Sequence, residues 1–487
     1  MIIYKNKLNF FKSVIILCWI ISLILFSFCP DNLDERYMSF TLINTFISTL
    51  SFIFYQKKVL KKNFYLSISS LFIISLIITH FQIPLAHVFG FNIQTELFIN
   101  FIWADTTIGN LSVAISSLAL ISFYLGYIIN RKIKNDHFTK IYTNNYHRLI
   151  NVLTLLSIIF YLLFFVTSGS YMYGKYGVGD QLIVSNYFAL LFNLFFKSAL
   201  IIKMYIINFN IKNISNLKEY ILFIGFPMTF LFAWHLLFSL FVGDRGPVIV
   251  YGILYFGLYF LRISRKTLII TLCVSVIFPV VLSIIGASRS RISNESFEQR
   301  VNSSDYKSRY SNNFQEDMPG LSTLELALSV RCLNHSVANV PKNYDYKYGV
   351  YQLKQVLASV PFLVGILENN FLETIKEEES TADFITYLIQ GENPSYGDAT
   401  TPVADLYLDF GPIGVFFGFF LFGFIFKKAD LIIFNGVYTS LFSWIAIMFF
   451  WSGSIYLGRA TFLYYLQSII QLYIVVVLLN SLLLKTK

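Results

Sequence analysis

Charged residues are scarce in this sequence. Asp, Glu, Lys and Arg together make up 13% of its 487 residues, whereas hydrophobic residues make up 56%. A soluble domain carries about 25% charged residues, so the composition excludes a soluble globular fold. The long apolar segments instead predict an all-α integral membrane protein that crosses the bilayer many times.

Residue patterns that hold metals or nucleotides are also missing. The four cysteines give no disulfide framework, because Cys18 and Cys273 lie inside apolar segments. No two of the six histidines have the spacing of ligands on one helical turn, and neither His-Glu-x-x-His nor Asp-x-Asp occurs. A phosphate-binding Gly-x-x-x-x-Gly-Lys-Ser/Thr segment is absent, which argues against an ATP-driven pump. We therefore expect chemistry without a metal or a cofactor.

The apolar segments predict transmembrane helices, since about 20 apolar residues cross the hydrocarbon core. We expect twelve such helices, at residues 11–29, 39–56, 64–86, 109–129, 149–167, 182–208, 219–241, 247–261, 267–285, 401–426, 430–450 and 461–483. The first is expected to remain as an uncleaved helix, because no small-x-small cleavage site follows it.

The net charge of +10 is distributed unevenly between the connections. Lysine and arginine gather in alternate connections, at residues 57–62, 131–140, 212–218, 262–266, 427–428 and 485–487. The intervening short connections hold only Arg36, Lys175, Arg245 and Arg459. By the positive-inside rule, this pattern places both termini in the cytoplasm. The basic excess is thus a topology signal, and we expect no nucleic-acid partner.

One polar stretch, residues 286–400, interrupts the apolar segments and is expected on the outer side. It divides the chain into nine transmembrane helices in residues 1–285, this loop, and three transmembrane helices in residues 401–487. Apolar residues recur with helical spacing at 321–339 and 350–367, and Pro361 should kink or end the second helix. We predict a partly helical cap lying on the membrane.

Arginines are expected near the outer membrane surface from widely separated parts of the chain. The candidates for binding an anion are Arg245, Arg289, Arg291, Arg331 and Arg459. The planar guanidinium matches phosphate oxygens with two parallel hydrogen bonds, so several arginines could neutralise a diphosphate without a metal. Two simpler interpretations remain open: Arg245 could pair with Asp244 in a tight turn, and Arg459 could extend to lipid headgroups.

Three residues are candidates for the base that removes a proton from an acceptor hydroxyl. Asp405 and Asp409 lie four residues apart where the chain re-enters the membrane, so they share one helix face. They could act as a general base or pair with nearby arginines for structural reasons. His335, one helical turn after Arg331, is the third candidate, because its ordinary pKa is near neutrality; a structural role is the alternative.

Four segments together resemble the Wzy family, the polymerases of O-antigen and related bacterial polysaccharides. They are Leu-Phe-Val-Gly-Asp-Arg-Gly-Pro-Val-Ile-Val at 240–250, Ile-Ile-Gly-Ala-Ser-Arg-Ser-Arg at 284–291, Thr-Pro-Val-Ala-Asp-Leu-Tyr-Leu-Asp-Phe-Gly-Pro-Ile-Gly at 401–414, and Gly-Arg-Ala-Thr-Phe at 458–462. The first 215 residues match only in hydropathy. Asp244 stands where relatives often have Ser, Thr or Gly.

The resemblance implies a glycosyltransferase of lipopolysaccharide biosynthesis with a membrane-embedded, GT-C-like fold. Its substrates would be oligosaccharide repeat units on undecaprenyl diphosphate, at the periplasmic face of the bacterial inner membrane. Arg245, Arg289, Arg291 and Arg459 would stabilise the diphosphate leaving group, and an Asp or His would take the acceptor proton. Membrane lipids, a chain-length regulator and a repeat-unit flippase are the partners that the family suggests.

Two other functions compete with this one. An O-antigen ligase uses the same donor but transfers the chain to lipid A core, and it shares the layout of helices with a large late outer loop. A lipid-linked oligosaccharide flippase should show repeat symmetry between its two halves. The sequence shows no such symmetry, because its connections differ greatly in length.

Overall fold

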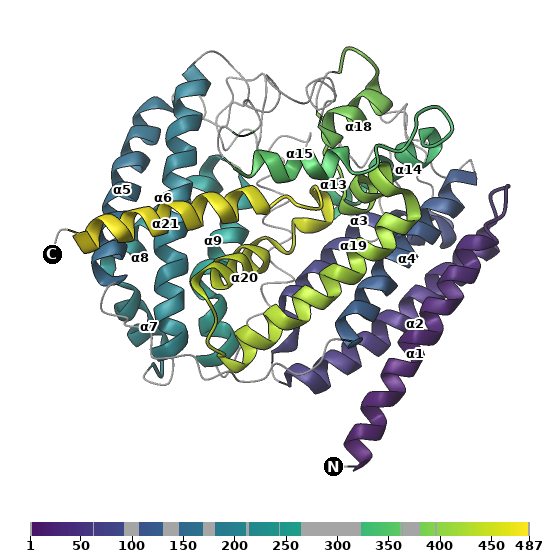
Figure 1. Cartoon of the computed structure of the whole chain (residues 1–487), viewed down its shortest axis with the longest axis horizontal. Helices are drawn as coiled ribbons and strands as arrows, with labels where there is room; N and C mark the ends of the chain where they lie inside the picture. The colour runs from purple at the N-terminus through teal and green to yellow at the C-terminus, as the bar shows by residue number, and fades with distance from the viewer. Residues whose placement is uncertain are drawn as a thin grey trace. The chain divides into compact units, whose positions relative to one another are not determined.

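The computed structural model describes most of the chain as helices. The described residues are 2–61, 63–91, 107–129, 146–168, 181–210, 214–242, 244–263, 323–360, 363, 380–394 and 397–485, and they contain no strand (Figure 1). The chain forms two compact units, which we call unit 1 and unit 2. Unit 1 comprises residues 1–134, 310–433 and 454–467, and unit 2 comprises residues 135–309, 434–453 and 468–487.

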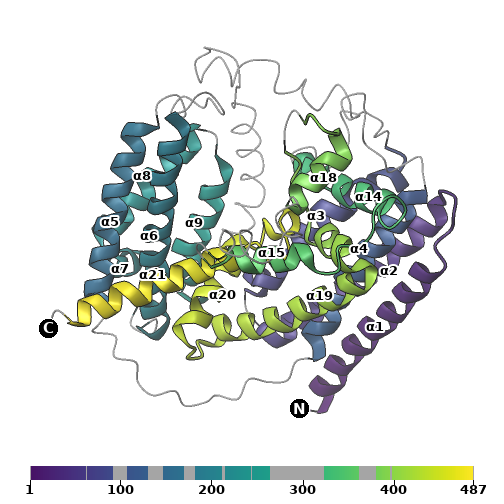
Figure 2. The same cartoon turned by 45° about the horizontal axis from the view of Figure 1, so that its top comes forward.

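Unit 1 holds four long N-terminal helices, a set of short helices and most of a long late helix. Its elements are α1 (Ile2–Ser27), α2 (Glu35–Leu60), η1 (Phe64–Leu66), α3 (Ile68–Val88), α4 (Thr107–Ile129), α13 (Leu324–Ala327), α14 (Val330–Asn339), α15 (Val350–Ala358), α18 (Thr381–Gln390), α19 (Pro402–Asn435) and η8 (Leu457–Arg459). The short helices α14, α15 and α18 lie beside the start of α19 in both views (Figures 1 and 2).

Helix α4 forms the core of unit 1 and packs closely against α19. A Cβ atom on Gly126 would lie 1.9 Å from the carbonyl oxygen of Phe420, and one on Gly423 would lie 1.9 Å from that of Phe123. Small residues that allow backbones to approach in this way are typical of helix pairs in membranes. The contact fixes α19, and therefore the residues at its start, on the N-terminal helices.

Unit 2 is built around α5 and α6, which pack side by side along most of their length. Its elements are α5 (Tyr146–Thr167), α6 (Gln181–Asn210), α7 (Leu217–Ile224), α8 (Phe226–Val242), α9 (Arg245–Leu258), η6 (Tyr259–Ile263), α20 (Leu441–Gly453) and most of α21 (Leu466–Lys485). Helices α7 and α8 meet at an angle of 101°. Gly225 joins them with φ +102, which L residues rarely adopt.

The described residues contain eight helices long and apolar enough to cross a membrane, or nine if the bent α7–α8 pair is one span. This agrees with the expected polytopic, all-helical class. The expected span 267–285 lies outside the described residues, and 246–262 and 441–453 form shorter apolar helices. The count of twelve and the topological division at 286 and 400 therefore stay predictions.

The structure differs from the expected spans in the region of α19. We expected a break between spans at 427–429, but α19 continues to Asn435. Lys427 is buried there and donates a hydrogen bond to Tyr55 Oη at 3.1 Å, while Asp430 accepts hydrogen bonds from Ser69 Oγ at 2.5 Å and the Ile68 N–H at 2.9 Å. These partners, in α2 and at the start of α3, stabilise the two charged residues inside a helix. Hydropathy alone assigns the same residues to a connection between helices.

The helix instead breaks earlier, at Gly411. This residue has φ 64 and ψ −158, which separates a short helix over 402–410 from the long one that follows. Pro412 lacks an N–H group and cannot continue the hydrogen-bond pattern across this point. The cap helices occur where they were expected: α13 and α14 within 321–339, and α15 from Val350. Helix α15 ends at Ala358, shortly before Pro361, as the proline predicts.

Candidate functional site

Asp405 and Asp409 lie in the short helical stretch that begins α19, and both side chains are fully buried. Asp405 accepts hydrogen bonds from four groups of unit 1. They are Thr381 Oγ1 at 2.6 Å, Gln352 Nε2 at 2.7 Å, the Phe462 N–H at 2.8 Å and Gln355 Nε2 at 3.1 Å. The carboxylate therefore joins α19 to α15, to α18 and to the segment after η8.

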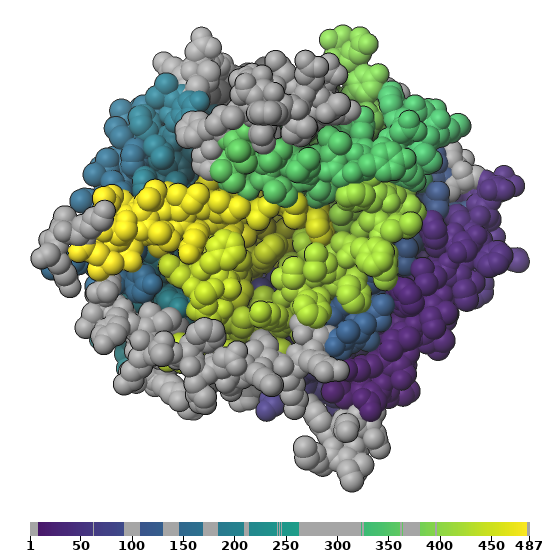
Figure 3. All heavy atoms as spheres, in the orientation of Figure 1, coloured from purple at the N-terminus to yellow at the C-terminus, as the bar shows by residue number. Residues whose placement is uncertain are grey.

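Asp409 caps the start of α15. Its carboxylate accepts hydrogen bonds from the backbone N–H groups of Tyr351 at 3.2 Å and Gln352 at 2.8 Å. These groups belong to the first turn of a helix, where the N–H groups have no partner within the helix and favour a negative charge. The backbone N–H of Tyr348 also donates to the Asp409 carbonyl at 2.8 Å. Figure 3 shows the green cap residues directly against the yellow-green start of α19.

Arg459 lies in a tight 3₁₀ turn that is attached to unit 1 at both ends. On one side, the Gly458 N–H donates to Ser75 Oγ of α3 at 3.0 Å. A Cβ atom on Gly458 would lie 2.4 Å from the same oxygen, so this approach requires glycine. On the other side, the Phe462 N–H is held by Asp405, and the Leu463 N–H donates to Gln355 Oε1 at 3.1 Å. The half-buried Arg459 is thus held in place by its neighbours in the chain.

Arg331, on α14, forms an ion pair with Asp398. The two side chains are 14% and 2% exposed. Asp398 also accepts a hydrogen bond from Gln390 Nε2 at 2.6 Å, and its backbone N–H donates to Thr386 Oγ1 at 2.8 Å. This arrangement joins α14 and α18 to the segment that leads into α19, which is a structural role for Arg331.

Two of the predicted arginines, Arg331 and Arg459, act electrostatically on the Cys332 thiol. Burial raises the pKa of the Cys332 thiol to about 12, and Asp398 also raises it, while the charges of Arg331 and Arg459 act in the opposite direction. Both guanidinium groups therefore lie close enough to the thiol to act on it electrostatically. His335, one turn further along α14, is 2% exposed. The structure thus brings Arg331, Arg459 and His335 into one region of unit 1.

The other predicted arginines are described in part or not at all. Arg245 is the first residue of α9 in unit 2, and only its backbone is described. Asp244 caps that helix by accepting a hydrogen bond from the Gly246 N–H at 3.2 Å, which agrees with the turn expected there. Arg289 and Arg291 lie outside the described residues. The convergence of these arginines with Arg459 stays a prediction.

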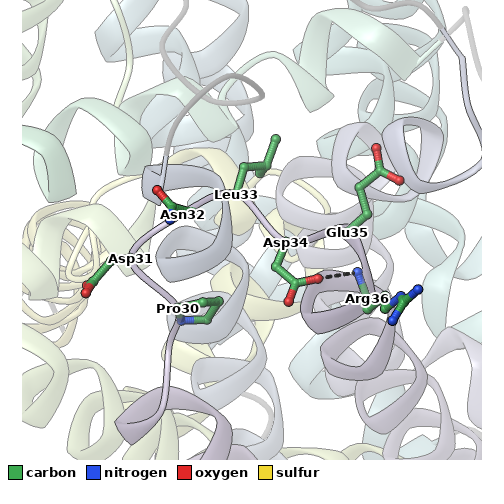
Figure 4. Close-up of a pocket in the computed structure, with 7 residues that line it drawn as sticks. All are labelled: Pro30, Asp31, Asn32, Leu33, Asp34, Glu35 and Arg36. Carbon is green, nitrogen blue, oxygen red and sulfur yellow. Dashed lines mark hydrogen bonds between the residues drawn. The ribbon is translucent and has the colours of Figure 1, made fainter.

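A surface pocket lies in the connection between α1 and α2, away from the predicted site residues in sequence. Figure 4 shows that it is lined by Pro30–Arg36 alone. Three of these residues, Asp31, Asp34 and Glu35, are acidic, and Asp34 is occupied in capping α2 through the Arg36 N–H at 2.8 Å. This charge does not suit an anionic ligand. Within the described ranges, no group of His, Cys, Asp and Glu is placed to hold a metal ion.

Sequence reasoning missed the neutral residues that surround Asp405. Gln352, Gln355 and Thr381 belong to no motif, and their role depends on contacts between separate helices. One signal was present: Gln352 and Gln355 are three residues apart, so they share a face of α15 that is otherwise apolar. Polar residues repeated on one face indicate a buried polar partner when the helix packs against a membrane domain.

One prediction tests the role of the Arg331–Asp398 pair. We expect Asp398→Ala to destabilise the protein by about 3–5 kcal/mol, because it leaves a buried guanidinium without its partner. The double variant Arg331→Met/Asp398→Leu should recover most of this loss in thermal denaturation of the purified protein. If the double variant is stable but makes no polymer, Arg331 contributes to activity beyond its structural pairing.

The fold and the site define a polytopic membrane protein in which short helices hold an arginine-bearing turn with the help of the buried Asp405 carboxylate. The chain matches the family model of O-antigen polysaccharide polymerase Wzy over residues 8–487, nearly its whole length, and it belongs to that family. Neither the search of curated proteins nor the search of solved structures found a match. Family membership confirms the resemblance and assigns the chain to the polymerisation of O-antigen repeat units.

Proposed function

We propose that this chain polymerises oligosaccharide repeat units carried on undecaprenyl diphosphate at the periplasmic face of the bacterial inner membrane. The bond between the growing chain and its diphosphate breaks, and a new glycosidic bond forms to a hydroxyl of the next lipid-linked unit. The hydroxyl proton passes to a base, and undecaprenyl diphosphate leaves. The proposal includes twelve spans, cytoplasmic termini, a periplasmic loop at 286–400 and a GT-C-like architecture.

The observation that carries the proposal is the attachment of the Arg459 turn. Ser75 holds one side through Gly458, and Asp405 holds the other through Phe462. A turn whose backbone is fixed in this way needs little reorganisation to present its guanidinium when charge develops on the leaving diphosphate. Its planar fork also matches two phosphate oxygens. We propose that Arg245, Arg289 and Arg291 supply further positive charge to the lipid diphosphates, without a metal.

The contacts favour positioning roles for Asp405 and Asp409. Both carboxylates are fully buried, and donors of unit 1 hold each of them in one place. Asp405 receives four such donors and Asp409 two from the backbone. Catalysis by Asp405, Asp409 or His335 stays a prediction. Of the three residues, His335 lies on the same helix as Arg331, in α14.

The experiment is gel analysis of surface polysaccharide from cells that lack this chain, with and without the wild-type gene. A polymerase predicts that the ladder of long chains disappears while a single repeat remains on lipid A core. Long chains retained on undecaprenyl diphosphate, with bare core, would show an O-antigen ligase instead. Lipid-linked single repeats that accumulate on the cytoplasmic face would show a flippase and contradict the roles given to the arginines.

A further inference from the structure

Unit 2 contains a lysine in the middle of a long apolar helix. Lys197 lies near the centre of the 30-residue α6, about 20 Å or more from either end at 1.5 Å per residue. That distance is too long for its side chain to reach the helix ends. The ammonium group lies 5.7 Å from the ring centre of Tyr251 on α9 and 6.0 Å from that of Phe449 on α20. No ion pair or hydrogen bond of Lys197 occurs among the described residues.

A histidine lies in the same place. His235, on α8, is 6% exposed, and both of its ring nitrogens lack a hydrogen-bond partner among the described residues. Its ring centre lies 4.8 Å from that of Phe192, 5.1 Å from that of Tyr251 and 5.6 Å from that of Tyr161. Tyr251 therefore contacts both Lys197 and His235. Five helices, α5, α6, α8, α9 and α20, contribute to this cluster.

The Lys197–His235 cluster is costly for the protein in the absence of a ligand. A charged side chain at the centre of a transmembrane helix is unfavourable, and such residues usually pair with another group or serve a function. A buried polar nitrogen without a hydrogen bond adds a further penalty. The aromatic rings around Lys197 reduce the cost through cation–π contacts, but they give His235 no acceptor or donor. A ligand with anionic oxygens would satisfy both groups.

We propose that the Lys197–His235 cluster binds a phosphate group of a lipid-linked saccharide, namely the second of the two that the reaction joins. This inference rests on the proposed function, because transfer from one lipid-linked unit to another requires two diphosphates to be bound at once. Lys197 supplies positive charge, and a ring N–H of His235 donates to a phosphate oxygen. The surrounding rings provide an apolar wall for the polyprenyl chain.

The position of the cluster within unit 2 agrees with this assignment. Tyr251 follows Arg245 by six residues on the same helix, which is about 9 Å along its axis. A lipid diphosphate near the start of α9 therefore needs to extend only a short way along that helix to meet Lys197. The first diphosphate is assigned to Arg459, in unit 1. The two positive sites thus belong to different units of the chain.

The test counts the lipids bound by the purified full chain. Undecaprenyl diphosphate is titrated onto the protein in detergent, and bound lipids are resolved by native mass spectrometry. We expect two bound lipids on the wild type. On Lys197→Met we expect one lipid at the same concentration, because loss of a charge-assisted hydrogen bond should weaken binding of the second lipid at least about tenfold. The matched control is Lys203→Met, on the same helix, whose ammonium lies 5.0 Å from the Phe223 ring; it should bind two.

The outcomes separate this inference from the proposed function. Two lipids on Lys197→Met with unchanged affinity would overturn the Lys197 site while leaving polymerisation intact. A wild-type chain that binds only one lipid, or none, would overturn both. His235→Phe provides a second variant and should also weaken the second lipid. Because Lys197→Met removes an unpaired charge, its melting temperature should not fall, so a loss of binding cannot be attributed to unfolding.

Discussion

Arg459→Ala is expected to abolish long-chain polymer. Removing one preorganised donor from a site where charge develops costs about 10²–10³ in turnover in other enzymes. A loss of that size in the rate at which purified protein extends lipid-linked repeat units would eliminate the ladder in cells. Arg459→Lys should recover only part of the rate, because a lysine ammonium keeps the charge but lacks the planar fork that binds two oxygens.

The control for this prediction is another arginine near the end of a helix. Arg36, in the first turn of α2, is exposed and lines the acidic surface pocket beside Asp34. Arg36→Ala should leave the rate and the ladder unchanged. If Arg459→Ala and Arg36→Ala both retain wild-type turnover, the guanidinium of Arg459 has no part in the reaction. The interpretation that Arg459 extends to lipid headgroups is then the better one.

The second large effect is expected at Asp405. Asp405→Ala leaves buried donors of Gln352, Thr381 and Phe462 without their acceptor. Each such donor costs about 1–3 kcal/mol, so we expect a loss of about 3 kcal/mol or more in stability. Turnover should fall as well, because the turn that carries Arg459 loses its attachment at Phe462. Thermal denaturation and the rate of chain extension measure the two effects.

A further variant separates positioning from general-base catalysis at Asp405. Gln355 binds both the Asp405 carboxylate and the Leu463 N–H, so Gln355→Ala weakens the turn and keeps the carboxylate. If Asp405 acts by positioning, Gln355→Ala should lower the turnover number, and raising the substrate concentration should not restore it. Normal turnover in Gln355→Ala, together with loss of the acidic limb of the pH–rate profile in Asp405→Asn, would instead indicate a base.

The sequence alone predicted the class of the protein and several local features correctly. Low charge and long apolar segments are properties of the chain itself, since the bilayer acts on each segment separately. The family was also predicted correctly, since the family model matches residues 8–487. The cap helices α14 and α15 were predicted from the spacing of apolar residues, and the end of α15 from Pro361.

The boundaries within α19 could not be predicted in this way. Lys427 and Asp430 have the charge of a connection, but Tyr55 and Ser69 from other helices provide their hydrogen bonds inside the helix. The break at Gly411 depends on a positive φ, which the sequence Gly-Pro permits but does not require. Both boundaries depend on contacts between residues that are far apart in the chain, and a hydropathy profile contains no information about such contacts.

The sequence thus determined that the chain is a many-pass membrane protein of the O-antigen polymerase family, because each of these properties depends on composition or on short contiguous segments. Only the tertiary structure decided what the charged residues contact. It pairs Arg331 with Asp398, surrounds Asp405 with Gln352, Gln355 and Thr381, and leaves Lys197 among aromatic rings. A hydrogen bond forms between side chains that folding brings within about 3 Å, and for these residues the partners come from different helices.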